Sequence, residues 1–304
     1  MSEAPITIAI PVYNREEIVK RTLESVANQT YRPLKVILVN NNSSDNTGEV
    51  LLSWKTANEG PDFRIDILDE ETPGACAARN RALEFIDTPW TMFFDSDDIM
   101  PPDHIEKAVD AIESNPDAQV VGWARKIHFI GGKTVTKTFS SRNMNYENLT
   151  QSIFATQNYL ARNDIFKKSG GWDRTIKVGQ DIELGSRIIG LNPKIIFIPN
   201  HFVDVYDSSN SITNTQSLDS LVYTLEKIRK TLPSRKRHWV DLQIIIKAAS
   251  WAKNDPESPG IVKEILRQTP LHRRILWKFF YWYQKHGGRG VARIYALMHF
   301  NRMA

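Results

Sequence analysis

Short apolar runs alternate with longer segments of mixed polarity through the first 115 residues of the chain. The apolar runs are rich in β-branched residues and poor in charge, which is typical of strands buried on both faces of a sheet. We predict four such strands, at Ile6–Ile10, Lys35–Val39, Arg64–Leu68 and Trp90–Phe94.

The segments between these strands carry apolar residues at helical spacing. They predict helices at Arg15–Gln29, Asn46–Trp54, Gly74–Phe85 and Pro102–Asn115. This alternation predicts an α/β fold, a Rossmann-like open and mostly parallel sheet with helices on both faces. The carboxyl ends of parallel strands share one edge, and ligands bind at that edge. We therefore expect the loops PVYN, NNNSSD, TPGAC and DSDD, which follow the four strands, to meet there.

The pattern changes after Asn115. Further strands are predicted at Gln119–His128, Lys133–Phe139 and Lys194–Ile198, and helices at Asn158–Lys168 and Asp181–Ile189. From Ser217 onward only helices are predicted. We expect an α/β domain over residues 1–216, divided at residue 115 into two halves, and a helical region over residues 217–304.

Composition and charge narrow the class of protein. Apolar residues make up 41% of the 304 residues, enough for a core, so a disordered chain is excluded. From Ser217 onward there are 17 Lys and Arg against 6 Asp and Glu; the preceding residues therefore have 22 against 29. This opposite balance of charge indicates that the two parts have different tasks.

Cysteine usage and hydropathy bear on location. Cys76 is the one cysteine, so no disulfide can form within the chain. The first residues lack the basic and apolar segments of a secretory signal, and no apolar run reaches 18 residues. We expect a cytoplasmic protein, or one that lies on the inner face of the cytoplasmic membrane.

Three carboxylates follow the fourth predicted strand, in the sequence TMFFDSDDIM. Asp95, Asp97 and Asp98 lie within four residues of each other, where like charges repel. Two carboxylates on one turn can hold Mg²⁺ or Mn²⁺ together with substrate phosphates, and the cation would offset the repulsion. A solvated turn in which Asp98 caps the next helix is the structural alternative.

Six motifs occur in one order along the first 210 residues. They are PVYN at Pro11–Asn14, NNNSSDNT at Asn40–Thr47, GACAARN at Gly74–Asn80, DSDD at Asp95–Asp98, GGWD at Gly170–Asp173 and GQDIELGSR at Gly179–Arg187. In order and spacing, this set resembles family 2 glycosyltransferases with the GT-A type of fold. The resemblance implies an inverting, metal-dependent transfer of a sugar from a nucleotide-diphosphate donor to an acceptor hydroxyl. It also implies that residues 1–115 bind the donor and residues 116–216 bind the acceptor.

The resemblance assigns roles to individual residues. The donor nucleotide would be bound by Pro11, Tyr13, Asn14, Asn40, Asn41, Asn42, Arg79 and Asp95. Asp95 and Asp97 would hold the divalent cation, Mn²⁺ or Mg²⁺, and Asp181 would be the general base. The acceptor side would include Trp172, Asp173, Gln180 and Arg187.

The chemistry of glycosyl transfer agrees with this division of labour. A cation neutralises charge on the leaving pyrophosphate without proton transfer. An inverting displacement needs one base on the face opposite the leaving group, and Asp181 is a single carboxylate far along the chain from DSDD. Asp181 can also cap the helix that follows it, which is compatible with a role as base.

Two motifs depart from the family's pattern. Asn40 and Asn41 stand where the family has acids that accept from the uracil N3–H; an amide can accept that bond but can also donate. A UDP-sugar donor is favoured by the resemblance, while GDP- and TDP-sugars stay open. Gln180 replaces the acid that precedes the base, which could alter acceptor binding. His201 is near, but offset from, the position of a histidine found in many relatives.

The segment Leu271–Phe300 combines six aromatic residues between Trp277 and Tyr283 with six basic residues and no acid. This composition predicts a helix that contacts an anionic membrane surface. Packing on the catalytic domain, or between copies in a homo-oligomer, is the alternative; nothing in the first 216 residues supports nucleic acid as a partner.

The predicted function is synthesis of a polysaccharide or surface glycan, with a glycan or lipid-linked acceptor. Two other classes are compatible with parts of the pattern. A phosphatase of the haloacid dehalogenase type also ends a strand in DxD, but places that motif at its first strand. A nucleotide-binding scaffold without turnover would not need Asp181.

Overall fold

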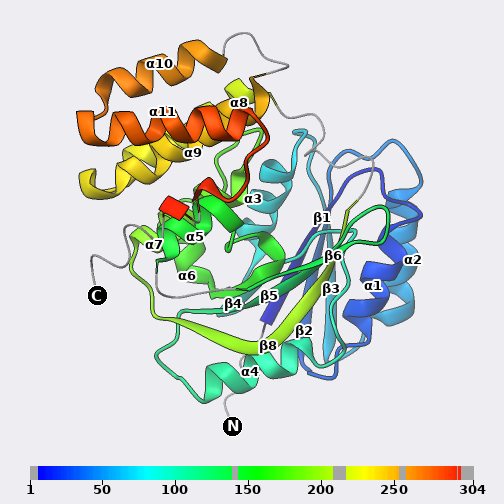
Figure 1. The fold of residues 1–304 in the computed structure, drawn as a ribbon. Coiled ribbons are helices and arrows are strands. Elements are labelled where there is room, and N and C mark those ends of the chain that lie inside the picture. Colours follow the sequence, from blue (N-terminus) through cyan, green and yellow to red (C-terminus); the bar gives the residue numbers. More distant parts are fainter. Residues whose placement is uncertain (1–5, 139–142, 208–216, 253–257, 293, 296–304) are drawn as a thin grey trace.

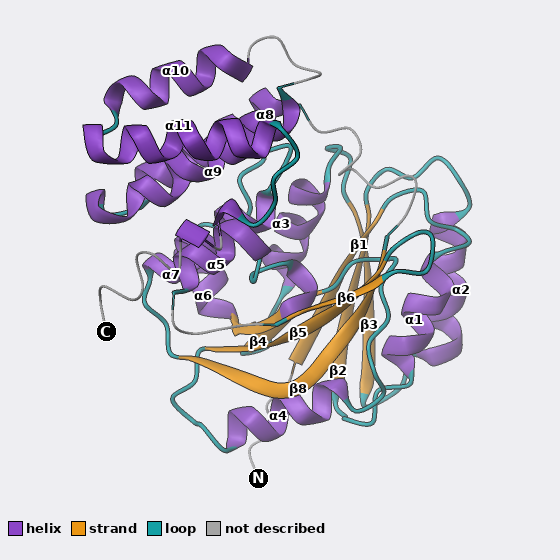
Figure 2. Ribbon diagram, in the orientation of Figure 1, coloured by secondary structure: helices purple, strands orange, loops and turns teal. Residues whose placement is uncertain are grey.

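A computed structural model describes residues 6–138, 143–207, 217–252, 258–292 and 294–295. The strands form one sheet in the order β3-β2-β1-β4-β7-β5-β6, with β8 also paired to β5 (Figures 1 and 2). Their bounds are β1 Ile6–Val12, β2 Leu34–Asn40, β3 Phe63–Asp69, β4 Trp90–Phe93, β5 Val120–His128, β6 Thr134–Lys137, β7 Tyr159–Arg162 and β8 Ile195–Tyr206.

Helices cover both faces of this sheet, and more helices follow it along the chain (Figure 2). Those before residue 200 are α1 Val19–Ala27, α2 Thr47–Asn58, α3 Ala75–Phe85, α4 His104–Glu113, α5 Met144–Gln151, α6 Asn163–Ser169 and α7 Gln180–Gly190, with the 3₁₀ turn η1 Thr156–Asn158. The C-terminal ones are α8 Leu218–Thr231, α9 Arg237–Trp251, α10 Ser258–Gln268 and α11 Leu271–Lys285, with the 3₁₀ turn η3 Ser234–Lys236.

The central strands are apolar on both sides because both faces are covered. In β1, Ile8 and Ile10 belong to the core layer under α1, α2 and α4, while Ala9 belongs to the layer under α3, α6 and α7. Successive side chains point to opposite faces, so a strand between two helix layers needs no polar alternation. The predicted α/β class is confirmed: β1 pairs in parallel with β2 and β4, and β2 pairs in parallel with β3.

The second half of the sheet is mixed, and here one predicted helix is wrong. The segment Asn158–Lys168 divides into strand β7 and helix α6. Strand β7 is antiparallel to both β4 and β5, so Tyr159, Leu160 and Ala161 are buried in the centre of the sheet. The pairing with β4 and β5 decides the structure of this segment against its local helical pattern. A strand of four residues is too short to change that pattern in the sequence.

Strand β8 extends well past the predicted Lys194–Ile198 and continues to Tyr206. Its pairing with β5 shifts register between Gly122 and Ala124. Asn200 has a left-handed backbone with φ of 56°. Because of this interruption, the sequence pattern does not indicate the second part of the strand. That part carries Asp204 and Tyr206 to the edge where β4 ends, and Asp204 there forms a β-bridge with Ile99.

The C-terminal helices are confirmed, and they pack as a layer beside α5 and α7, away from α1 and α2 (Figure 1). Their core contains Trp239, Val240 and Trp277, and it also takes in Leu149 of α5 and Val178 before α7. Within the described ranges, no helix combines the length and hydrophobicity that crossing a membrane requires. The division at residue 216 stays a prediction, because the two parts share apolar side chains.

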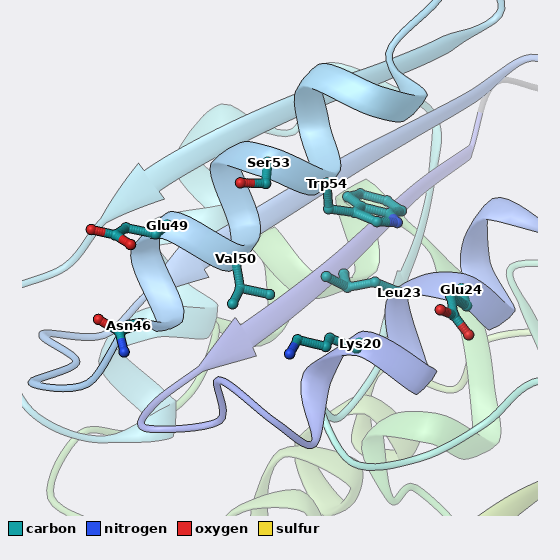
Figure 3. Close-up of a pocket in the computed structure, with 8 residues that line it drawn as sticks. All are labelled: Lys20, Leu23, Glu24, Asn46, Glu49, Val50, Ser53 and Trp54. Carbon is teal, nitrogen blue, oxygen red and sulfur yellow. The ribbon is translucent and has the colours of Figure 1, made fainter.

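A groove lies between α1 and α2 on the outer side of their helix layer (Figure 3). Lys20, Leu23 and Glu24 line it from α1, and Val50 and Trp54 from α2. None of the residues predicted for donor, metal or acceptor binding lines this groove. The candidate site lies instead at the carboxyl edge of the sheet.

Candidate active site

The loops after β1 and β2 are held together by hydrogen bonds, as the parallel arrangement predicts. The Asn14 amide donates to Ser44 Oγ at 3.3 Å, and its Oδ1 accepts from the Ser44 backbone N–H at 2.8 Å. Asn14 itself has φ of 48°, a left-handed conformation that asparagine tolerates better than most residues. Asn14 therefore joins the loop after β1 to the loop after β2 at the carboxyl edge of the sheet.

Asn41 connects the second loop to the third. It is buried, its amide donates to the carbonyls of Glu70 and Thr72, and its Oδ1 accepts from the Gly74 N–H at 2.7 Å. Both amide hydrogens and the oxygen are thus engaged by the protein. These contacts indicate that Asn41 holds the two loops together and does not bind a nucleobase directly.

Asn40 lies beside a carboxylate, Asp69, that belongs to none of the six motifs. Its amide donates to Asp69 Oδ1 at 3.2 Å, and the two residues are register partners on β2 and β3. Asp69 is exposed, as are Asn42 and the ring of Tyr13, which is 57% exposed. Pro11, at the end of β1, is half-buried. The outer part of this edge therefore offers an aromatic ring, amides and an acid to a ligand.

Asp95 is held by two groups that come from other parts of the chain. Arg79 Nη2 of α3 donates to its Oδ1 at 2.8 Å, and Thr156 Oγ1 of η1 donates to the same oxygen at 3.2 Å. The second carboxylate oxygen has no such contact among the described residues. Thr156 belongs to the second half of the chain and carries no motif, so sequence gave no signal for it.

Asp97 lies near two arginines, Arg15 before α1 and Arg21 within it. Arg15 Nη2 lies 3.9 Å from Asp97 Oδ2, and Arg21 Nη2 donates to the Asp97 carbonyl at 2.6 Å. Burial and the neighbouring Asp95 charge raise the pKa of Asp97 above its usual value. Arg15 directly follows the PVYN motif, a position from which its presence here could have been predicted.

Asp98 does not cap the next helix, so that prediction is wrong. It is buried, and its Oδ1 accepts from the backbone N–H of Tyr206 at 3.0 Å. Helix α4 begins at His104, six residues on, which places Asp98 too far away to cap it. Burial, followed by the charges of Asp95 and Asp97, raises the pKa of Asp98 well above its usual value. Asp98 joins the DSDD turn to the end of β8.

Arg79 is the centre of the candidate site. It is 6% exposed, and it reaches both Asp95 and Gln180, whose Oε1 accepts from Nη1 at 3.4 Å. Burial opposes its charge, but the carboxylates of Asp95 and Asp181 outweigh burial and raise the pKa of Arg79. One cation thus connects the DSDD turn to the start of α7, which lie far apart in the sequence.

Asp181 lies in the first turn of α7, after Gly179, which occupies the cap position. Burial raises the pKa of its carboxyl group, and the Arg79 charge partly opposes that rise. The Trp172 indole N–H lowers this pKa as well. Within the described part of the chain, neither Asp181 Oδ1 nor Trp172 Nε1 makes a hydrogen bond of normal geometry. A carboxylate with a raised pKa and a free oxygen is suited to accept a proton.

Trp172 is buried rather than open to an acceptor. Its ring packs on Phe93 at a centroid distance of 4.3 Å, and its backbone exchanges two hydrogen bonds of 2.8 Å with the Asn80 amide. Gly171 has φ of 68°, and a Cβ there would lie 2.6 Å from Asn80 Oδ1. The GGWD turn therefore needs glycine to bring α3 and α7 together.

Asp173 and Arg187 also make protein contacts. Asp173 binds Lys227 of α8 and Thr175; burial raises its pKa, but these bonds outweigh burial and lower the pKa to about 2. Arg187 forms a two-bond ion pair with Glu183, at 2.8 and 2.6 Å, and donates to the Ser169 carbonyl. Arg187 thus positions the turn before Trp172, and Asp173 joins the site to the C-terminal helices.

A group of cations on β5, β6 and α9 was not predicted. Arg125 and Lys137 are directly opposite each other on β5 and β6. Arg125 is buried and donates to the carbonyls of Gln151 and Ser152 at the end of α5. Burial, Arg125 and Lys247 lower the pKa of Lys137 to about 8. Neither Lys137 nor Lys247 forms an ion pair with another described residue.

Two single residues named from the sequence lie in the structural core. His201 stacks on His104, with their ring nitrogens 2.6 Å apart, and burial lowers the pKa of each ring. His201 therefore joins β8 to α4 and does not reach the DSDD turn. Cys76 is buried, and burial raises the pKa of its thiol to about 12, which favours the unreactive thiol form.

Asp95 and Asp97 fit the donor chemistry of a hard divalent cation. Oxygen ligands suit Mg²⁺ and Mn²⁺. Burial, followed by the Asp95 charge, raises the pKa of Asp97, and a nearby cation would offset the repulsion between the two carboxylates. In the part of the chain that the structure describes, no group of three His, Cys, Asp or Glu side chains is arranged to hold a metal. The remaining ligands would therefore come from substrate phosphates and water.

Comparison with known sequences identifies related proteins. The family model for glycosyl transferase family 2 matches residues 7–170, more than half of the chain. Glycosyltransferase GlyA of Streptococcus pneumoniae serotype 4 is 27% identical over 207 residues, which are 64% of this chain and 29% of that protein. WfgD of Escherichia coli, named as a UDP-Glc:α-D-GlcNAc-diphosphoundecaprenol β-1,3-glucosyltransferase, is 32% identical over 116 residues, 38% of this chain and 44% of that protein. The match thus spans less than half of either relative.

Solved structures show the same fold. S. aureus TarS 1–349 in complex with UDP-GlcNAc matches 96% of this chain and 91% of its own, with a TM-score of 0.71 and 15% identity. The mannosyltransferase PcManGT from Pyrobaculum calidifontis, in complex with GDP-Man and Mn²⁺, matches 96% of this chain and 86% of its own, with a TM-score of 0.59 and 16% identity. The fold and the extent of the family match together show that the chain belongs to glycosyl transferase family 2.

Proposed function

We propose that this protein transfers a sugar from a nucleotide-diphosphate donor to an acceptor hydroxyl, with inversion at the anomeric carbon. The observation that carries the proposal is the position of Arg79, which connects Asp95 on the donor side to the start of α7, where Asp181 lies. One buried cation thus binds Asp95 of the acid turn proposed for the donor and Gln180, the first residue of the helix that carries the separate buried carboxylate Asp181. This arrangement supports the division of labour that glycosyl transfer needs.

Asp95 and Asp97 would hold the divalent cation, Mn²⁺ or Mg²⁺. When bound, the cation would supply positive charge to the leaving diphosphate. Arg15, 3.9 Å from Asp97, adds positive charge at the same turn. The buried contact of Asp98 with the Tyr206 backbone fixes the DSDD turn to the end of β8. Asp95 and Asp97 therefore need not reorganise when the donor arrives.

Asp181 would accept the proton of the acceptor hydroxyl as that oxygen attacks the anomeric carbon. Burial raises its pKa and so makes it a stronger base than an exposed carboxylate. Gln180 leaves Asp181 without the acidic neighbour that the family pattern has. Arg79 then has two carboxylates beside it, Asp95 and Asp181, and not three.

A UDP-sugar is the favoured donor. Although Asn40 and Asn41 replace the family's acids, the carboxylate of Asp69 lies 3.2 Å from the Asn40 amide at the same edge. A carboxylate only accepts hydrogen bonds when ionised, and uracil offers its N3–H as a donor. Tyr13 is exposed beside this edge and would stack on the base. GDP- and TDP-sugars are the alternatives.

The acceptor side supports an anionic, lipid-linked glycan, as in synthesis of a polysaccharide or surface glycan. Arg125 and Lys137 place two cations opposite each other with no described carboxylate paired to Lys137. Like charges facing each other across two strands are unfavourable unless an anion lies between them. The name of the relative WfgD describes a diphosphate-linked lipid acceptor, which has such an anion beside its sugar.

The first experiment measures transfer and donor binding with the same protein. Nucleotide diphosphates and their sugars are screened by thermal shift with Mn²⁺, since specific binding raises the melting temperature by mass action. The donor so found is then given to the parent and to Asp181→Asn with a panel of acceptors. We expect Asp181→Asn to bind donor like the parent and to lose about 10²–10⁴-fold in transfer rate.

Four outcomes would contradict the proposal. If no nucleotide gave a Mn²⁺-dependent shift, the donor role of the DSDD turn would be wrong. If Asp181→Asn turned over at the rate of the parent, Asp181 would not be the base. A product with retained anomeric configuration, read by NMR, would exclude inversion. Release of phosphate from simple phosphate esters without a sugar donor would favour the phosphatase class.

A further inference from the structure

Helix α11 has apolar side chains on two opposite sides. One side is buried, with Trp277 and Phe280 at 1% and 2% exposure in the core of the C-terminal helices. The other side is open: Leu271 is 68% exposed, Ile275 66% and Phe279 54%. A helix that only packs on its own protein would not need this second apolar side.

The exposed side chains form one continuous surface, which we call the α11 stripe: Leu271, Ile275, Phe279, Trp282 and Tyr283. Their separations of three or four residues place them along one face of the helix. The Phe279 ring lies 6.2 Å from the Trp282 ring and 6.1 Å from the Tyr283 ring, centroid to centroid. Other exposed apolar side chains of the molecule, such as Leu52 on α2, lie on other elements.

Basic side chains border the α11 stripe. Lys278 and Lys285 are exposed and are seven residues apart, two helical turns, so they lie along one border of the stripe. His272 is exposed near the other border. Lys278 has no ion pair with any residue of the described ranges. The sequence has no acid after Glu264 that could neutralise this charge.

We propose that the α11 stripe binds the surface of a membrane that contains anionic lipids. Aromatic and aliphatic side chains with a basic border suit a helix that lies in the plane of the headgroups. The lysines would face the negative surface while the aromatic rings enter the interface. A second copy of this chain fits less well, because antiparallel contact of two stripes would bring their lysine borders together, and α11 has no acid that could pair with the border of a second copy.

This inference does not depend on the reaction proposed above, because it concerns a surface made by α11 alone. The test is co-sedimentation of the full chain with vesicles of phosphatidylcholine, with and without phosphatidylglycerol. Two variants remove the stripe's anchors, Phe279→Ser and Trp282→Ser. Leu52→Ser is the matched control, since Leu52 is 60% exposed on α2. A charge variant, Lys278→Glu with Lys285→Glu, tests the border.

We expect the parent and Leu52→Ser to bind vesicles that contain phosphatidylglycerol, and to bind phosphatidylcholine alone much less. Phe279→Ser and Trp282→Ser together should lower the partition coefficient about tenfold or more, with unchanged circular dichroism. The Lys278→Glu, Lys285→Glu variant should lose the preference for anionic vesicles. Asp181→Asn should bind vesicles like the parent, which separates this test from that of the reaction.

Three results would overturn the proposal. One is a parent protein that stays in the supernatant with both kinds of vesicle. Another is binding that survives loss of Phe279 and Trp282 but not loss of Leu52. The third is a dimer in light scattering that Phe279→Ser dissociates, with no vesicle binding, which would assign the stripe to a second copy.

Discussion

Charged side chains are buried at the carboxyl edge of the sheet, whereas those of the C-terminal helices lie mostly at the surface. At the edge, Arg79 and Asp98 are 6% and 2% exposed, and Arg125 is 5% exposed. The C-terminal helices are held by an apolar core that contains Trp239 and Trp277. One ion pair, Arg229–Asp241 at 2.6 Å, joins α8 to α9 in the described part of these helices.

The difference shows which part of the molecule gives up stability for function. Burial opposes the charges of Arg79 and Arg125 and raises the pKa of Asp181 and Asp98, so each of these groups is held against a desolvation cost. An apolar set of residues would fill this edge more stably. In the described C-terminal helices, burial raises the pKa of Asp241, which pairs with Arg229, but exposed charged residues such as Lys278 and Lys285 are free to face a partner.

The largest expected effect comes from the apolar core of the C-terminal helices. Trp277→Ala removes a side chain that is 1% exposed and should lower the free energy of unfolding by about 3–5 kcal/mol. We expect one transition in urea, followed by circular dichroism, because Leu149 and Val178 join this core to the α/β part.

Trp282→Ala on the same helix is the matched control. Its side chain is 56% exposed, so the loss should be within about 0.5 kcal/mol. A second, separate transition in Trp277→Ala would show that the helices unfold on their own, and would place a true domain boundary near residue 216.

The next effect comes from the buried charge at the sheet edge. Arg79→Leu leaves Asp95 and Asp181 without their shared cation, and removal of one partner of a buried pair costs about 3 kcal/mol. The expected result is a fall of that size in urea denaturation at neutral pH, together with loss of donor binding. The loss should shrink at acid pH, because burial raises the pKa of Asp181 and protonation removes the charge that Arg79 would otherwise face.

Arg81→Leu, two residues on in α3, is the control for that measurement. Arg81 pairs with Glu84 at the surface, and exposed pairs of this kind contribute about 0–1 kcal/mol. Equal losses for Arg79→Leu and Arg81→Leu would mean that burial of charge does not distinguish the two regions.

Most of the fold of residues 6–115 could be predicted from the sequence, because strands β1 to β4 are local apolar runs and the loops after β1, β2 and β4 carry motifs. The edge at which Asn14, Asn41 and Asp95 meet follows from parallel pairing alone. The pattern failed where long-range pairing decides the structure. Strand β7 has four residues between two partners, and β8 is interrupted near Asn200.

The contacts inside the site were harder to predict than its location. Thr156 donates to Asp95, and the charge of Arg125 is influenced by Asp181, Asp98 and Asp95, yet both residues lie in segments without a motif and no local signal marks them. Asp98 seemed suited to cap a helix because it precedes one, but its acceptor bond goes to Tyr206, 108 residues away. Motifs therefore located the site, while tertiary contacts decided which side chains are free to act.

A smaller effect is expected at the GGWD turn, where the backbone of Trp172 contacts Asn80 of α3. Gly171→Ala places a Cβ 2.6 Å from Asn80 Oδ1 at a φ of 68°, and should cost about 1–3 kcal/mol in unfolding free energy. Gly60→Ala is the control, since a Cβ there meets nothing within 4 Å. If both variants melted like the parent, the Asn80–Trp172 contact would not be a constraint on the site.

The smallest effect is a pH dependence at Lys137. Burial, Arg125 and Lys247 lower its pKa from 10.5 to about 8, so between these values the unfolded chain keeps a proton that the folded chain has lost. Stability due to Lys137 therefore rises with pH across this window. Lys137→Met should be more stable than the parent below pH 8, and the difference should shrink towards pH 10.

Urea denaturation at several pH values measures this difference, with Lys133→Met, at the exposed turn of the same hairpin, as the control. Pyrophosphate added at pH 7 should stabilise the parent more than Lys137→Met, because an anion between Arg125 and Lys137 removes their repulsion. A difference that did not change with pH would mean that Lys137 is open to solvent. In that case the charge of Lys137 would lie at the surface, as the charges of the C-terminal helices mostly do. The contrast between buried charge at the sheet edge and surface charge on those helices would then rest on Arg79 and its neighbouring carboxylates.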